Sequence, residues 1–211
     1  MLLKKIGVIK EMLLPPEFVQ GEQEFGGKGN NWRLSYHPRK FKDTDSGAQI
    51  ILYYRGKPPY KTAGDAFRVL LTQSPGTHFE QSKDTNTRPI ASIMKNLSEA
   101  LGPAADNQLL NHEPPGLNGP LFFLQKMAVA MVNKRKVLAL TGVFHGTSVP
   151  VEEFEGHPTT SYYHGLLFDS APGNQPCSIE EIVLQASTQA LLEQYLPSFE
   201  KTVASIRWSD I

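Results

Sequence analysis

The sequence predicts an α+β protein with a bent antiparallel β-sheet and helices packed on it. Segments with strand character dominate the second half, short connections join them, and helical apolar patterns precede and follow them. Short connections favour antiparallel neighbours, because parallel strands need long crossovers. We expect about five to seven strands and about three principal helices.

Two short strands are expected in the first quarter of the chain. Residues 32–37 alternate apolar and polar side chains, and residues 48–54 (AQIILYY) are rich in β-branched and aromatic side chains. The segment 21–31 (GEQEFGGKGNN) is polar and rich in glycine, so we expect it to be a loop.

Two helices are expected next. Residues 62–72 place apolar side chains on one face, with Thr62 as the expected N-cap and Asp65 in the first turn. Residues 89–101 show the clearest helical pattern in the chain, and Gly102 is suited to end that helix.

Two long polar segments, 73–88 and 102–120, are expected to be loops. Both are read as insertions on a single domain that spans residues 1–211, because surface loops tolerate insertions well.

The second half of the chain is expected to be mainly β-structure. Residues 122–144 form two apolar strands around the basic segment 134–136, which predicts a β-hairpin with a basic tip. We expect this hairpin to lie centrally in the sheet, because both its strands are long and apolar. Residues 162–168 are a third strand.

Residues 182–186 fit two structures equally well. They read as a fourth strand, but Ser178 and Glu181 have the spacing of a capping box, which favours a helix. The sequence then ends in a helix, which Pro197 should kink or interrupt. Its apolar residues recur at spacings of three and four, and Leu192 and Phe199 among them, together with Trp208, are expected in the core.

Composition limits the kinds of partner. Lys and Arg number 21 and so do Asp and Glu, and this balance argues against capture of nucleic acid or of an anionic membrane. No apolar run is long enough to span a membrane. Cys177 is the only cysteine, so no intrachain disulfide is possible, and residues 1–14 read as mature sequence. We therefore expect a cytoplasmic protein.

The stretch from about residue 121 to residue 208 resembles the PsbP-like fold. The similar segments are the hairpin FFLQKMAVAMVNKRKVLALTGVF, the strand YYHGLLFD and the ending YLPSFEKTVASIRW. The resemblance implies an α/β/α sandwich with a strongly bent sheet. It also implies a role without catalysis, because members are mostly photosystem extrinsic subunits, a nuclear-transport cofactor, and chaperones of secreted bacterial effectors.

Histidines provide the main candidates for chemistry. His145, His157 and His164 lie near Asp169 and Cys177, and imidazole, carboxylate and thiolate groups are zinc ligands. One hypothesis is therefore a hydrolase or metal-dependent enzyme that uses His145, His164 and Asp169. Exposed histidines and an inert Cys177 are the simpler interpretation, and on it we expect no bound metal or cofactor.

The favoured hypothesis is a non-enzymatic binding or adaptor protein whose partner is another protein. Leu109, Leu110 and Leu117 are the candidate partner-binding residues, because the 102–120 loop combines leucines with prolines. A specific version, by analogy with the PsbP-like members, is a chaperone or accessory subunit of a bacterial secretion system.

Overall fold

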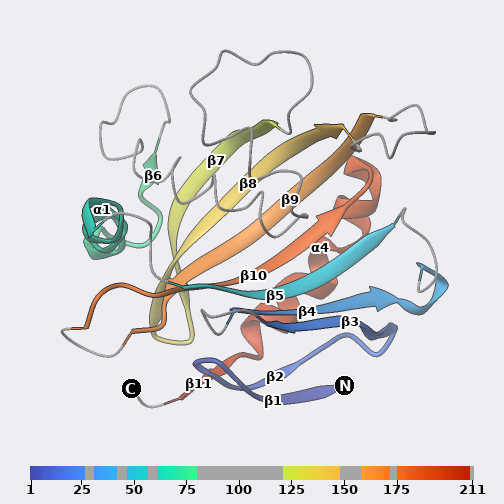
Figure 1. The fold of residues 1–211 in the computed structure, drawn as a ribbon, viewed down its shortest axis with the longest axis horizontal. Coiled ribbons are helices and arrows are strands. Elements are labelled where there is room, and N and C mark those ends of the chain that lie inside the picture. The colour runs from blue at the N-terminus through green and yellow to red at the C-terminus, as the bar shows by residue number, and fades with distance from the viewer. Residues whose placement is uncertain are drawn as a thin grey trace.

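A computed structural model of the chain describes residues 1–26, 31–41, 47–56, 61–79, 121–147, 158–171 and 175–209. These residues form an 8-stranded sheet in the order β3-β4-β5-β10-β9-β8-β7-β6 and a 3-stranded sheet in the order β1-β2-β11 (Figure 1). Neighbouring strands are antiparallel throughout both sheets. The α+β class and the antiparallel sheet are therefore confirmed.

The elements follow one another along the chain with these bounds. The strands are β1 (Leu2–Ile6), β2 (Ile9–Leu13), β3 (Phe18–Gly26), β4 (Asn31–Pro38), β5 (Ala48–Gly56), β6 (His78–Phe79), β7 (Leu121–Val132), β8 (Arg135–Thr147), β9 (Pro158–Asp169), β10 (Ile179–Ala186) and β11 (Arg207–Trp208). The helices are the 3₁₀ turn η1 (Arg39–Phe41), α1 (Lys61–Thr72) and α4 (Gln189–Ala204).

The two α-helices in the described residues pack on opposite faces of the large sheet. Helix α4 contacts β10, β5 and β9, and its residues Tyr195 and Phe199 join one buried apolar cluster. Helix α1 contacts β8, and its residues Phe67 and Leu70 join a second cluster. Because side chains alternate along a strand, both faces of the central strands are covered.

Strand β10 lies between β5 and β9, and every one of its residues is buried. Ile182 and Leu184 face the α4 cluster, while Val183 faces the α1 cluster. This placement decides between strand and helix for residues 182–186 in favour of a strand. The capping-box reading is wrong, because Glu181 instead accepts a hydrogen bond from the Tyr163 hydroxyl across the sheet.

The expected hairpin exists, but its expected position is wrong. Strands β7 and β8 meet at a turn in which Asn133 and Lys134 have φ angles of 44° and 69°, as a tight hairpin turn requires. The pair lies toward the β6 edge of the sheet, and β10 and β9 occupy the middle. With 8 strands in the large sheet, the expected strand number was also too low.

The first 26 residues form more β-structure than their composition indicates. Strand β3 runs to Gly26 and β4 begins at Asn31, so residues 21–26 and residue 31 of the expected loop are strand, and residues 27–30 lie outside the described parts of the chain. Strands β1 and β2 form a hairpin whose turn includes Gly7 at a φ of 53°. A side chain at position 7 would collide with the carboxyl group of Glu180, so this glycine lets the hairpin lie against the large sheet.

Helix α1 covers the expected residues but begins differently. It starts at Lys61, so Thr62 lies inside the helix and is not its N-cap, and no acidic residue occupies its first turn. Residues 80–120 lie outside the described parts of the chain. The helix expected over 89–101, most of the 73–88 loop and the whole 102–120 loop therefore stay predictions, and so does the single domain over 1–211.

Helix α4 confirms the expected terminal helix. Thr188 caps it by accepting a hydrogen bond from the backbone N–H of Leu191 at 3.2 Å, and the helix continues through Pro197 without interruption. Pro197 is exposed, so the carbonyl that its ring leaves unpaired faces solvent, while Tyr195 and Phe199 hold both halves on the sheet. Leu192 and Phe199 are buried as expected, and Trp208 is partly buried against the same cluster.

None of the helices in the described ranges is both long enough and apolar enough to cross a membrane.

Candidate functional site

A groove of about 310 Å³ lies between the C-terminal half of α4 and the strands β7, β8 and β9. On the sheet side its wall includes Ala130, Val132, Ala139, His164 and Leu166. On the helix side its wall includes Phe199, Glu200, Val203 and Ala204. The described wall is therefore mainly apolar, with an imidazole and a carboxylate as its ionisable groups.

Short side chains open this groove. Ala130 and Ala139 stand on adjacent strands, and Ala204 stands opposite them at the end of α4. Larger residues at these positions would fill the space between helix and sheet, as they do nearer the start of α4, where Leu192 and Tyr195 are buried. The groove is thus a place where the packing of α4 on the sheet is incomplete.

His164 is the polar side chain on the sheet side of the groove. It lies on β9 between Tyr162 and Leu166, both of which belong to the α4 cluster, so its ring also faces α4. The ring meets Phe199 edge-on at a centroid distance of 5.8 Å. His164 is half-buried, and within the described part of the chain its ring nitrogens make no hydrogen bond.

Burial also governs the ionisation of this histidine. Loss of hydration lowers the pKa of His164 below its usual 6.5, and the negative charge of Glu200 opposes that shift only in part. The imidazole is therefore neutral near pH 7, with one nitrogen that donates and one that accepts. Such a ring offers a ligand either kind of hydrogen bond.

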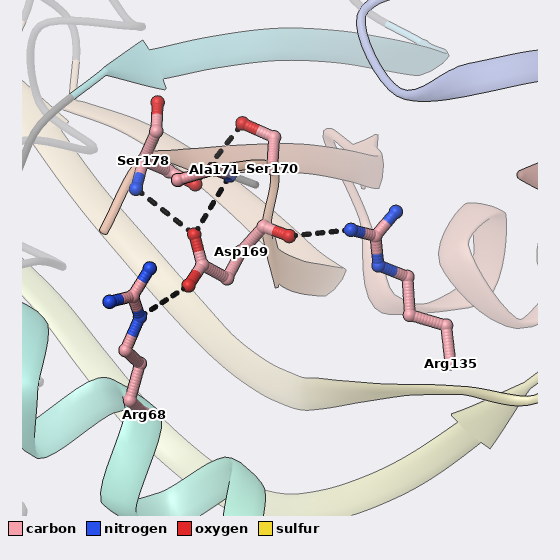
Figure 2. Close-up of polar contacts among 6 residues, drawn as sticks. All are labelled: Arg68, Arg135, Asp169, Ser170, Ala171 and Ser178. Carbon is pink, nitrogen blue, oxygen red and sulfur yellow. Dashed lines mark hydrogen bonds and ion pairs between the residues drawn. The ribbon is translucent and has the colours of Figure 1, made fainter. Parts of the chain in front are cut away.

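A second polar cluster surrounds Asp169 at the end of β9 (Figure 2). Its Oδ2 accepts a hydrogen bond from Arg68 Nε at 2.6 Å, and its Oδ1 accepts from the backbone N–H groups of Ala171 and Ser178 at 3.0 and 3.1 Å. Its backbone carbonyl accepts from Arg135 at 2.8 Å. These contacts tie α1, β8 and the β9–β10 connection together, so we assign the cluster a structural role.

Of the described candidate zinc ligands, the structure brings Asp169 and Cys177 together but keeps the histidines apart. Asp169 pairs with Arg68 of α1, whereas the ring of His164 packs on α4, so the two side chains lie on opposite faces of the sheet. His145 pairs with Thr160 and His164 pairs with Thr141, so the two histidines do not lie opposite each other on the paired strands. Their backbones lie about 13 Å apart along the ladder.

His157 lies outside the described residues, and so do Leu109, Leu110 and Leu117. In the ranges that the structure covers, no three histidine, cysteine or acidic side chains are grouped as a metal site would require.

Cys177 is buried in the α1 cluster, as an inert cysteine would be. Burial raises the pKa of its thiol to about 12, and the neighbouring charge of Asp169 raises it further. Arg68 opposes this shift, but its guanidinium already pairs with Asp169. The thiol therefore stays protonated near pH 7 and is not a reactive nucleophile.

Glu180 is a buried carboxyl group that holds the β1–β2 turn. It is 3% exposed, and its Oε2 accepts a hydrogen bond from the backbone N–H of Val8 at 3.2 Å. Burial raises its pKa above the usual 4.5, while Val8, Ser170 and Arg135 oppose the shift.

This shift predicts how stability depends on pH. Above pH 4.5 the unfolded chain releases the Glu180 proton more readily than the folded chain does. The contribution of this group to the free energy of unfolding is therefore present at low pH and is lost as pH rises through the folded pKa. Glu180→Gln should remove that pH-dependent loss.

The measurement is urea denaturation of both proteins at several pH values from about 4.5 to 8. The stability of the wild type relative to Glu180→Gln should fall as pH rises. Glu193→Gln, which removes an exposed carboxylate from α4, should run parallel to the wild type. If the free energy of unfolding of the wild type instead rose relative to that of Glu180→Gln as pH increases, the raised pKa assigned to Glu180 would be wrong.

No model of a protein family matches the chain, and no curated protein matches its sequence.

Sequence reasoning missed the groove, although one of its residues was a candidate. The alternative enzyme hypothesis grouped His164 with His145 and Asp169, and the structure places it with Phe199 and Glu200. The available signal was the row Tyr162, His164, Leu166, Phe168 on one face of a strand, in which a histidine interrupts an apolar series. Nothing in the sequence of that strand indicates that α4 forms the other wall of the groove.

Proposed function

We propose that this chain is a non-enzymatic binding protein that acts as an adaptor, and that the groove beside α4 is one of its binding sites. The observation that carries the proposal is His164, a neutral imidazole without a hydrogen-bond partner in the described residues, set in an apolar wall. A concave, mainly apolar surface with few polar groups is typical of ligand sites.

The large sheet with α1 and α4 on opposite faces is compatible with a PsbP-like sandwich, and we propose that architecture for the whole chain. Its members mostly act by binding, which supports an adaptor role. Service as a chaperone or accessory subunit of a bacterial secretion system is the specific form of the proposal, and it rests on this resemblance alone.

The partner is proposed to be another protein. Leu109, Leu110 and Leu117 remain the candidate contact residues for it, and the groove adds a second, independent place for an apolar group. A protein with two such sites is able to hold one partner while it binds another component, as an adaptor does.

The test is affinity purification of tagged chain from its native source, with identification of the proteins that accompany it. Ala204→Phe places a large side chain over the groove from an exposed helical position, and Gln194→Phe adds the same side chain elsewhere on α4. A third form replaces residues 105–117 with a short glycine-serine linker.

We expect the linker form to lose the accompanying protein while it stays folded, because the contact residues proposed for that protein lie in the replaced segment. Ala204→Phe should lose the component that occupies the groove, and Gln194→Phe should retain both. The double variant His145→Ala, His164→Ala should keep the protein partner bound through residues 105–117. Retention of the same partner by every form, or a catalytic activity that this double variant abolishes, would overturn the proposal.

A further inference from the structure

The groove beside α4 also has features that define what it binds. Its volume of about 310 Å³ is at the lower end of the range for small-molecule sites. If each non-hydrogen atom takes roughly the 30 Å³ that a water molecule has in the liquid, about ten atoms fit, and tightly bonded ring atoms take less. This size suits one or two fused or linked rings.

The walls determine the polarity of the occupant. Val132, Leu166, Phe199 and Val203 present aliphatic and aromatic surface, so most of the occupant must be apolar. Asn133 is not available to bind it through nitrogen, because its Nδ2 donates to the carbonyls of Ala204 and Ile206 at 2.9 and 2.6 Å. His164 therefore supplies the hydrogen bond that orients the occupant.

The charge of the wall limits the charge of the occupant. Among the described residues of the wall, Glu200 carries the only full charge near pH 7, and it is negative. The neutral ring of His164 does not offset it. An anionic ligand would lose hydration against the apolar wall without a cationic partner among the described wall residues, and the exposed carboxylate of Glu200 would repel it.

We propose that the groove beside α4 binds a small, uncharged, mainly aromatic molecule with one hydrogen-bonding group directed to His164. This inference rests on the proposed binding role of the groove and adds the chemical class of its ligand. The class excludes carboxylates, phosphates and sulfonates of the same size.

Two dyes that differ in one group test this class. 1-Naphthylamine has two fused rings and an uncharged amino group at pH 7.5, and 1-naphthylamine-4-sulfonate is the same molecule with a sulfonate added away from the amine. The fluorescence of both depends on the polarity of their surroundings. Titration of the folded full chain with each dye at pH 7.5 gives two dissociation constants.

We expect the uncharged dye to bind at least about tenfold more tightly than the sulfonate. Ala204→Phe should raise the dissociation constant of the uncharged dye at least about tenfold, and Gln194→Phe should leave it unchanged. His164→Leu should raise it about threefold to tenfold, through loss of one hydrogen bond. Glu200→Gln should lower the dissociation constant of the sulfonate and leave that of the uncharged dye unchanged.

Equal affinity for both dyes, or uncharged-dye binding that Ala204→Phe leaves intact, would overturn the ligand class. Thermal unfolding of each variant verifies that weaker dye binding is not caused by loss of the fold.

The results distinguish failure of the ligand class from failure of the adaptor role. If Ala204→Phe loses the native partner while neither dye binds the wild type, the binding role stands and the ligand class is wrong. If the uncharged dye binds as expected but no groove or loop variant affects a native partner, the adaptor role is wrong.

Discussion

Replacing Phe199 with alanine should lower the free energy of unfolding by about 3–5 kcal/mol. The ring is 1% exposed and belongs to the cluster between α4 and the sheet, where it also contacts the ring of His164. Its removal takes apolar surface out of contact and enlarges the groove, because the rigid sheet behind it cannot collapse into the space. A loss of this size is a large part of the 5–15 kcal/mol that stabilises a typical domain.

Urea denaturation followed by circular dichroism measures this effect. Glu200→Ala is the matched control, since it alters the next residue of α4 but removes an exposed side chain. It should change the free energy of unfolding by no more than about 0.5 kcal/mol. If Phe199→Ala unfolds at the same urea concentration as the wild type, α4 is not anchored to the sheet by this ring.

Asp169→Ala should cost about 3 kcal/mol, because it leaves several donors without their acceptor. The backbone N–H groups of Ala171 and Ser178 lose their partner, and the guanidinium of Arg68 loses its ion pair. Part of this cost is screened by water, since the side chain of Arg68 is 32% exposed.

Asp169→Asn separates the two contributions. The amide oxygen still accepts from both backbone N–H groups, while the amide NH2 cannot accept from Arg68, whose partly exposed guanidinium turns to water. This variant should lose about 1–2 kcal/mol. Asp65→Ala, which removes an exposed carboxylate from α1, is the control and should be nearly neutral. Equal losses for the alanine and asparagine variants would show that the ion pair, and not the backbone N–H groups, provides the stability.

Local patterns were sufficient to predict several elements. The 134–136 tip predicted the β7–β8 turn, because basic residues between two apolar strands mark a hairpin. The apolar spacing of Leu192, Tyr195 and Phe199 predicted α4 and its buried face. These signals depend on neighbours in the sequence, so they can be read without knowledge of the fold.

The position of each strand in the sheet could not be read in the same way. Strand β10 contains Glu180 and Glu181, which are poor markers of a central strand. Both are tolerated because partners far away in the sequence, Val8 and Tyr163, donate hydrogen bonds to them. The apolar hairpin looked more central, but strand order depends on such long-range partners.

The candidate groove could not be predicted from the sequence for a related reason. A groove exists where two elements fail to fill the space between them, and Ala130 and Ala204 are ordinary residues in their own segments. Their effect appears only when α4 lies over β7 and β8. His164 was identified as a candidate, but its neighbours were not.

The place of β10 in the chain governs how this sheet assembles during synthesis. Strand β10 joins β5 to β9, yet it follows every other strand of the large sheet along the chain. Until the ribosome has released residues 179–186, the groups β3-β4-β5 and β9-β8-β7 have no common strand and present open edges toward each other. Open edges of partly made sheets are prone to aggregation, so the nascent chain depends most on cellular protection just before its last strand of this sheet emerges.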